Sequence, residues 1–294
     1  MVVLRKFIIK AEPMRKLLIP TDFSENAMNA ISYALETFKY EHSEFFIMHA
    51  YADEVYEANT QTSRAAFEDL KESIHNKSLE RLDETLKSIK KTATNPRHHY
   101  SVIIFFGTLI DAANEIVDRE NIDIVIMGTK GETDDREITF GSNTVQILKY
   151  VKSPVLAIPS KYPNNPPINI LFPTDYLLPY KRRELKLAST LAKSFVAKIN
   201  FLHLSNFENL SFRQEDNKAF LESIMADNLK SFHQATGTDL SATINNFIND
   251  LDINLLIMVN SRHSFLENLL YLTTVDKIGL QIKIPFLILQ NLPR

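Results

Sequence analysis

The sequence predicts an α/β fold made of two repeated, doubly wound, Rossmann-like parallel-sheet domains. A chain of 294 residues is too long for one typical domain and suits two of about 150 residues each. Short apolar runs also recur in the same order in both halves of the chain. Segments with helical periodicity separate these runs, as expected when helices cover both faces of a parallel sheet.

The first strand is expected in Lys16–Ser24 (KLLIPTDFS), after a basic and apolar N-terminal extension. An apolar stripe with helical spacing follows over residues 27–38, with Ser24 as the expected N-cap. The run Phe45–Tyr51 (FFIMHAY) predicts the second strand, and the spacing of apolar residues over 67–89 predicts a long helix. Both strands are continuous apolar runs, which is typical of strands buried on both faces.

Two further strands complete the first half, in Ile122–Gly131 (IDIVIMGTKG) and Ser153–Pro159 (SPVLAIP). A helix is expected between them, starting at Gly141-Ser142. His98 and His99 precede another apolar segment and are expected to face solvent.

The second half repeats this order. The matching runs are NILFPTDYL (169–177), INFLHLS (199–205), LDINLLIMVNSR (251–262) and IPFLILQ (284–290). Phe232–Leu240 is expected to be too short and polar for a clear strand. We therefore expect domains over residues 1–160 and 168–294. They would be joined by a linker over 161–167, within the Pro- and Asn-rich stretch Ser160–Pro167.

Composition excludes several classes of function. The chain has no cysteine, so it has no disulfide, no catalytic thiolate and no zinc–thiolate site. Its net charge of −3 argues against broad electrostatic binding to nucleic acid. No apolar run reaches the roughly 18–20 residues that cross a bilayer, and the N-terminal stretch lacks a signal-peptide pattern. We expect a cytoplasmic globular protein without a membrane partner.

Glycine usage points to a binding site. The chain has six glycines, where an average protein of this length has about 20. Three of the six, Gly128, Gly131 and Gly141, lie between an apolar strand and a helix. Glycines there let the backbone approach a phosphate or adopt positive φ, and a helix N-terminus attracts anions. The alternative is that these glycines only turn the strand into the helix.

The spacing Gly-x2-Gly-x9-Gly-Ser resembles the ATP-binding branch of the universal stress protein family. It follows a DIVIMGT strand, and IPTDFSENAMNAISYA before it and SPVLAIP after it strengthen the resemblance. The likeness covers nearly all of the first half and the second half more loosely. It implies a five-stranded parallel sheet in each domain, ATP at the strand ends, and pairing of domains through the last strand.

By position, the resemblance also implies a set of ligand-binding residues. Pro20, Thr21 and Asp22 would form the wall beside the ribose or adenine, and the backbone of Ala50 would meet the adenine. The base or ribose would lie against Met127, with the phosphates and ribose held by Gly128, Gly131, Gly141, Ser142, Asn143 and Thr144. Asp22 alone could equally be a turn residue or a helix N-cap.

A cation could accompany the phosphates. The loop after Gly131 carries Glu132, Asp134, Asp135 and Glu137, which would repel a polyphosphate unless Mg²⁺ intervenes or the loop faces solvent. No metal ligand is assigned.

The second half serves as an internal control, because residues 127–154 align with 258–285 without a gap. Val259, Arg262, Leu272 and Thr273 then replace Gly128, Gly131, Gly141 and Ser142. Bulky side chains do not admit a phosphate against the backbone, so we expect one nucleotide site per chain.

No catalytic base or nucleophile can be nominated from the sequence. The expected function is that of an ATP-binding regulatory or sensor protein of the stress response. A slow ATPase or phosphotransfer enzyme, and a nucleotide-free scaffold, are the alternatives.

The last strand of each half is expected to pair with the other. Val155–Ile158 and Phe286–Leu289 are apolar, and each would lie at a sheet edge. We expect them to pair antiparallel as an intrachain pseudo-dimer, and association into homo-oligomers through other surfaces stays open.

Overall fold

The computed structural model describes residues 14–59, 63–130, 140–178, 180–205, 209–236, 239–260 and 283–291. The first half contains, in order, β1 (Arg15–Pro20), α1 (Glu25–Thr37), β2 (Ser43–Ala50), α2 (Ala52–Ala58), α3 (Arg64–Thr92), β3 (His98–Phe105), α4 (Leu109–Glu120), β4 (Ile124–Gly128), α5 (Ser142–Tyr150) and β5 (Val155–Ile158). The second contains β6 (Asn169–Thr174), α6 (Arg182–Ser194), β7 (Lys198–Leu204), α7 (Phe212–Ile224), β8 (Leu229–Ala235), α8 (Leu240–Asp250), β9 (Leu255–Asn260) and β10 (Phe286–Gln290).

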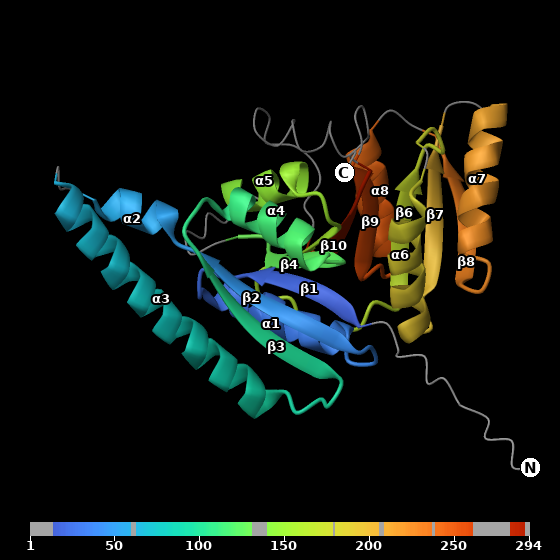
Figure 1. Ribbon diagram of the computed structural model, residues 1–294. Coiled ribbons are helices and arrows are strands. Elements are labelled where there is room, and N and C mark those ends of the chain that lie inside the picture. Colours follow the sequence, from blue (N-terminus) through green and yellow to red (C-terminus); the bar gives the residue numbers. More distant parts are fainter. Residues whose placement is uncertain are drawn as a thin grey trace, which may run out of the picture.

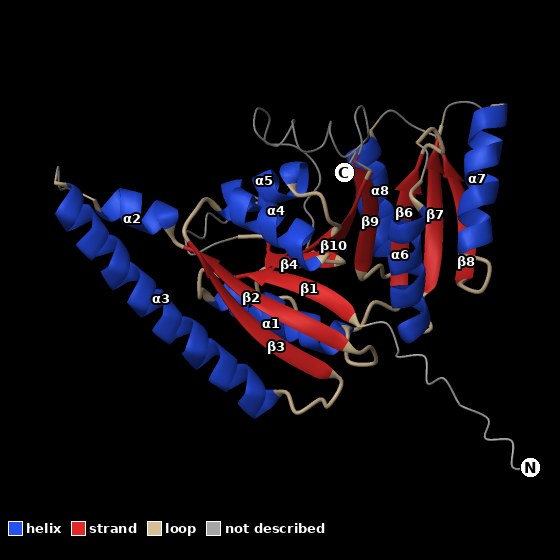
Figure 2. Ribbon diagram, in the orientation of Figure 1, coloured by secondary structure: helices blue, strands red, loops and turns tan. Residues whose placement is uncertain are grey.

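All ten strands form one twisted sheet with helices on both faces (Figures 1 and 2). The order is β3-β2-β1-β4-β5-β10-β9-β6-β7-β8, so the second half repeats the first in reverse across the sheet. Within each half all strand pairs are parallel, which confirms the predicted α/β fold. None of the helices in the described part of the chain has the length and apolar character needed to span a bilayer.

The local signals in the sequence form the elements they predict. The Ser24 hydroxyl caps α1 by accepting a hydrogen bond from the amide of Ala27 at 3.2 Å, and the stripe of α1 faces the sheet. Leu17, Leu18 and Ile19 of β1 are all 0% exposed, since helices cover both faces of the strand.

The expectation that the region around Phe232 is too polar for a strand is wrong. Leu229–Ala235 forms β8, which pairs in parallel with β7 along its whole length. β8 is the edge strand of the second half, so each of its side chains retains some solvent exposure and polar residues are tolerated there.

The expectation that His98 faces solvent is also wrong. His98 begins β3 and is only 7% exposed, whereas its neighbour His99 is exposed. Successive strand residues point to opposite faces, so only one of the two rings enters the core. The Nε2 atom of His98 donates to the carbonyl of Phe38 at 3.2 Å, and burial lowers the pKa of the ring.

The two halves meet where β5 and β10 pair antiparallel, as predicted. Leu156 lies opposite Leu287, with Val155 opposite Ile288 and Ala157 opposite Phe286. Each face of the sheet carries one apolar core that contains residues of both halves. The join is therefore part of the hydrophobic core.

The segment between the two halves packs against helix α1. The ring of Tyr162 lies 5.8 Å from that of Tyr33 in an edge contact, and Asn164 donates to the Ser32 hydroxyl at 2.7 Å. These contacts fix the path of the chain from β5 to β6. The expected domain boundaries on either side of residues 161–167 remain a prediction.

Leu287→Ala should lower the free energy of unfolding by about 2–5 kcal/mol, because it opens a cavity under both halves. Leu79→Ala, at a position 39% exposed on α3, is the matched control and should change stability by no more than about 0.5 kcal/mol. Urea unfolding measures both values. Equal small losses for the two variants would show that the join between the halves contributes little to the core.

The buried ring of His98 should make folding stability depend on pH. Its pKa is lowered in the folded state, so its contribution is present above the unfolded value of about 6.5 and is lost as the pH falls below it. We expect His98→Gln to lose less stability than the parent between pH 7 and pH 5. The control His99→Gln should keep the parent's pH dependence. An unaltered slope in His98→Gln would contradict this account.

Candidate functional site

The candidate site lies at the carboxyl ends of β1 and β4, where the strand order reverses. β1 has β2 on one side and β4 on the other, so the loops after β1 and β4 leave the sheet on opposite faces. The pairing of Leu18 with Val125 brings the ends of the two strands, Pro20 and Met127, to the same edge. Ligands of open α/β sheets bind in the crevice that forms at such a point.

Gly128 ends β4 where there is little room for a side chain. A Cβ atom there would lie 3.2 Å from the carbonyl oxygen of Asn26, in the first turn of α1. Gly128 does not adopt positive φ, so it is needed for close packing of α1 against β4.

Gly141 is the N-cap of α5 and likewise has an ordinary backbone conformation, with φ −66° and ψ 161°. Being a glycine, this N-cap has no side chain of its own to cap the helix, and no side-chain cap is found among the described residues. Ser142 and Asn143 are exposed in its first turn. A helix begins with N–H groups that lack partners within the helix, so this end of α5 suits an anion.

Thr144 ties this helix to the strand. Its hydroxyl is buried and lies 3.1 Å from the carbonyl of Gly128 and 3.0 Å from that of Thr129. The amide of Gly141 donates to the same Thr129 carbonyl at 2.8 Å. These contacts give Thr144 a positioning role at the start of α5 that the sequence did not reveal.

Gly131 and the acidic residues 132, 134, 135 and 137 lie outside the described residues. Within the described ranges, no group of three or more histidine, aspartate or glutamate side chains could hold a metal ion.

The turn after β1 recurs after β6 with the same geometry. Thr21 Oγ1 accepts from the amide of Phe23 at 3.0 Å, and Thr174 Oγ1 accepts from the amide of Tyr176 at 2.9 Å. Phe23 and Tyr176 both take positive φ, at 64° and 56°. Positive φ is uncommon for residues other than glycine, so the two turns share a strained conformation.

The aspartates of these turns also match. Asp22 Oδ1 accepts from the amide of Ser24 at 3.0 Å, and Asp175 Oδ1 accepts from the amide of Leu177 at 2.8 Å. Asp22 is thus a turn residue rather than the N-cap of α1, which is Ser24. Its carboxylate is exposed at the crevice.

A buried histidine supports each turn. His49 Nδ1 donates to the carbonyl of Thr21 at 2.8 Å, and His203 Nδ1 donates to that of Thr174 at 3.1 Å. The rings of Phe23 and Tyr176 pack on them, with centroids 4.6 and 5.0 Å apart. The histidines therefore hold the turns in place by hydrogen bonding and packing.

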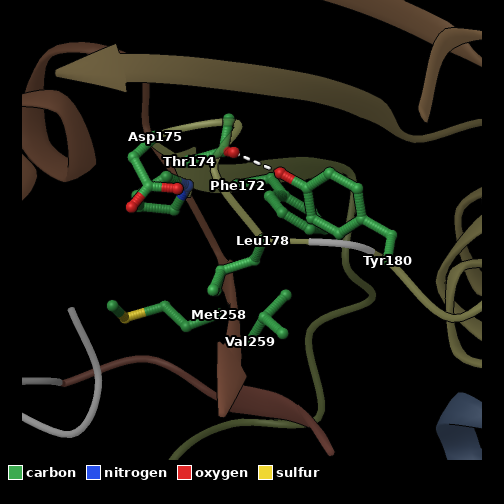
Figure 3. A pocket seen from close by; sticks show the side chains of 8 residues that line it. Phe172, Thr174, Asp175, Leu178, Tyr180, Met258 and Val259 are labelled. Carbon is green, nitrogen blue, oxygen red and sulfur yellow. Dashed lines mark hydrogen bonds between the residues drawn. The ribbon is translucent and has the colours of Figure 1, made fainter. Parts of the chain in front are cut away.

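The equivalent place in the second half is filled by the protein itself (Figure 3). Tyr180 shares a hydrogen bond with Thr174, and Leu178 lines the same space with Met258 and Val259. The remaining cavity is about 20 Å³, room for roughly one water molecule. Burial raises the pKa of the Tyr180 phenol above its ordinary value, so the side chain stays neutral.

A longer loop brings these side chains in. α1 begins three positions after Asp22, whereas α6 begins seven positions after Asp175. The extra residues include Leu178 and Tyr180. Their signal in the sequence is the longer gap between the Pro-Thr-Asp turn and the next apolar stripe.

The described site residues of the first half lie together at one edge of the sheet. The structure brings Pro20, Thr21, Asp22, Met127, Gly128, Gly141, Ser142, Asn143 and Thr144 to the β1–β4 crevice, with Ala50 ending the next strand, β2. The uncapped start of α5 would face phosphates, and the lack of a Cβ at Gly128 keeps α1 and β4 close. Gly131 cannot be placed.

Comparisons with known proteins agree on one family. The sequence profile of the universal stress protein family matches residues 13–159, half of the chain. Universal stress protein MJ0577 of Methanocaldococcus jannaschii is 29% identical over 157 residues, which cover 50% of this chain and 96% of that protein. Universal stress protein MJ0531 of the same organism is 25% identical over 144 residues, 49% of this chain and 81% of its own.

Several solved structures match both halves. A universal stress protein from Archaeoglobus fulgidus aligns over 94% of this chain and 96% of its own, with a TM-score of 0.65 and 17% identity. At that identity the match shows a shared fold.

Proposed function

Because the chain belongs to the universal stress protein family, we propose that its first half binds ATP and that the protein acts as a nucleotide-responsive regulator. The observation that carries the proposal is the start of α5. This helix begins at Gly141 without a side-chain cap, beside the crevice where β1 and β4 diverge. Its free N–H groups and partial positive charge would bind the phosphates.

The strand ends would hold the nucleoside. Ala50 ends β2, and Met127, 7% exposed, precedes Gly128 at the end of β4. The exposed carboxylate of Asp22 can accept hydrogen bonds from ribose hydroxyls with the oxygen that the turn does not use. Mg²⁺ would offset the charge of the triphosphate, and the proposal assigns it no ligand.

The filled space in the second half supports a single site per chain. Tyr180 and Leu178 lie where a nucleotide would need room, and Val259 replaces Gly128. The second half therefore contributes to the protein as a folded partner of the first. A cytoplasmic location, expected from the cysteine-free composition, is part of the same proposal.

The number of sites tests this proposal directly. Calorimetric titration of the purified full chain with MgATP should give one site per chain, because Leu178 and Tyr180 fill the equivalent place in the second half. Two comparable sites would overturn the assignment of the second half. Steady release of phosphate from the same samples would favour the slow ATPase instead.

Gly131→Val should weaken ATP binding by roughly a hundredfold or more, which corresponds to losing about two charge-assisted hydrogen bonds. The fold should persist, since Arg262 occupies the equivalent place in the second half. Gly237→Val, the same substitution between β8 and α8 of the second half, is the matched control and should bind as the parent does. If Gly131→Val binds ATP normally, the phosphates lie elsewhere.

A further inference from the structure

The helix that starts at the proposed phosphate site is held at its other end by the second half. Gln290 Nε2 and Asn260 Nδ2 both donate to the carbonyl of Leu148, at 2.9 and 3.1 Å. This carbonyl belongs to the last turn of α5, whose C=O groups lack partners within the helix. The second half thus caps a helix of the first.

These two amides form a closed network inside the protein. Asn260 also donates to Gln290 Oε1 at 2.8 Å, and the two side chains are 8% and 0% exposed. They end the neighbouring strands β9 and β10, in register with each other. Buried polar groups of this kind are costly unless paired, so the network fixes the position of Leu148 closely.

The second half also touches the start of α5. Phe140, directly before the N-cap Gly141, stacks on Phe286 of β10 with ring centroids 5.9 Å apart. Both rings are buried, at 4% and 0% exposure. Figure 1 shows α5 above the strands of the first half, with β10 passing beside it.

Thr129 and Asn260 occupy equivalent positions in the two halves, and they hold opposite ends of α5. Thr129 follows Gly128 at the end of β4, and Asn260 follows Val259 at the corresponding point of β9. The carbonyl of Thr129 receives the Gly141 amide and the Thr144 hydroxyl, while the Asn260 side chain reaches Leu148. Val259 lines the filled cavity of the second half, so that cavity lies one residue from this contact.

We propose that the second half is a clamp on α5, and that Asn260 and Gln290 are positioning residues for the nucleotide site. The inference rests on the proposed nucleotide binding. A helix held at both ends presents its N–H groups in one fixed arrangement. Nucleotide binding then costs less conformational entropy, because the helix is already ordered. Through the same contacts, nucleotide binding at the start of α5 is coupled to the conformation of the second half. This coupling is reciprocal.

The test compares the full-length parent with Asn260→Val/Gln290→Met, which keeps broadly similar side-chain volume but removes both donors to Leu148. Asn200→Val is the matched control. Asn200 is 2% exposed in the second half and donates to the Ile170 carbonyl at 3.2 Å, a contact that does not involve α5. Both variants should lose thermal stability. Only the double variant should bind MgATP more weakly, by about fivefold or more in calorimetric titration.

Amide hydrogen exchange over residues 142–151, measured without nucleotide, separates the clamp from the proposed function. It should be faster in the double variant than in Asn200→Val. Equal exchange in the two variants, or equal ATP affinity of the double variant and the parent, would overturn the clamp. A parent that binds no ATP would instead overturn the proposed function, while the exchange comparison still decides the clamp. Gln290→Met alone serves if the double variant does not fold.

Discussion

The antiparallel contact between β5 and β10 is the constraint on which the rest of this structure depends. It converts two five-stranded sheets into one sheet of ten, with a continuous core on each face. Leu156 and Leu287 lie opposite each other in this contact and are 1% and 0% exposed. The same contact carries β10 to the side of α5, where Gln290 can reach a helix of the first half. The contact between β5 and β10 therefore both holds the core together and positions α5 at the candidate site.

The two halves have kept one turn and changed its use. Threonine, aspartate and a positive-φ aromatic residue have the same hydrogen bonds after β1 and after β6, supported by His49 and His203. In the first half α1 begins three positions after Asp22. In the second, the longer loop places Tyr180 over the turn and fills the space. Whether each half has space for a ligand therefore depends on the length of the loop after this turn as much as on glycine content.

The sequence was sufficient for the α/β class, for most strands and for the start of α5, since these follow from apolar runs and the glycine motif. The antiparallel join followed from the apolar last strands together with the family resemblance. The sequence was misleading at β8 and His98, because exposure at an edge strand depends on neighbours far away in the chain. It also could not reveal the role of Gly128 against Asn26. That contact depends on how closely α1 packs against β4, which no local pattern records.

The capping of α5 by Asn260 and Gln290 has a consequence for how such a protein can diverge. In a dimer of identical subunits, every residue at a twofold interface occurs twice, so a change that improves one contact is imposed on its mirror image. Joining both halves in one chain removes that restriction. Position 260 can carry an amide that reaches Leu148, while the matching position 129 keeps a threonine whose backbone serves the other end of the same helix. Covalent linkage has thus allowed the two sides of a once-equivalent interface to specialise independently.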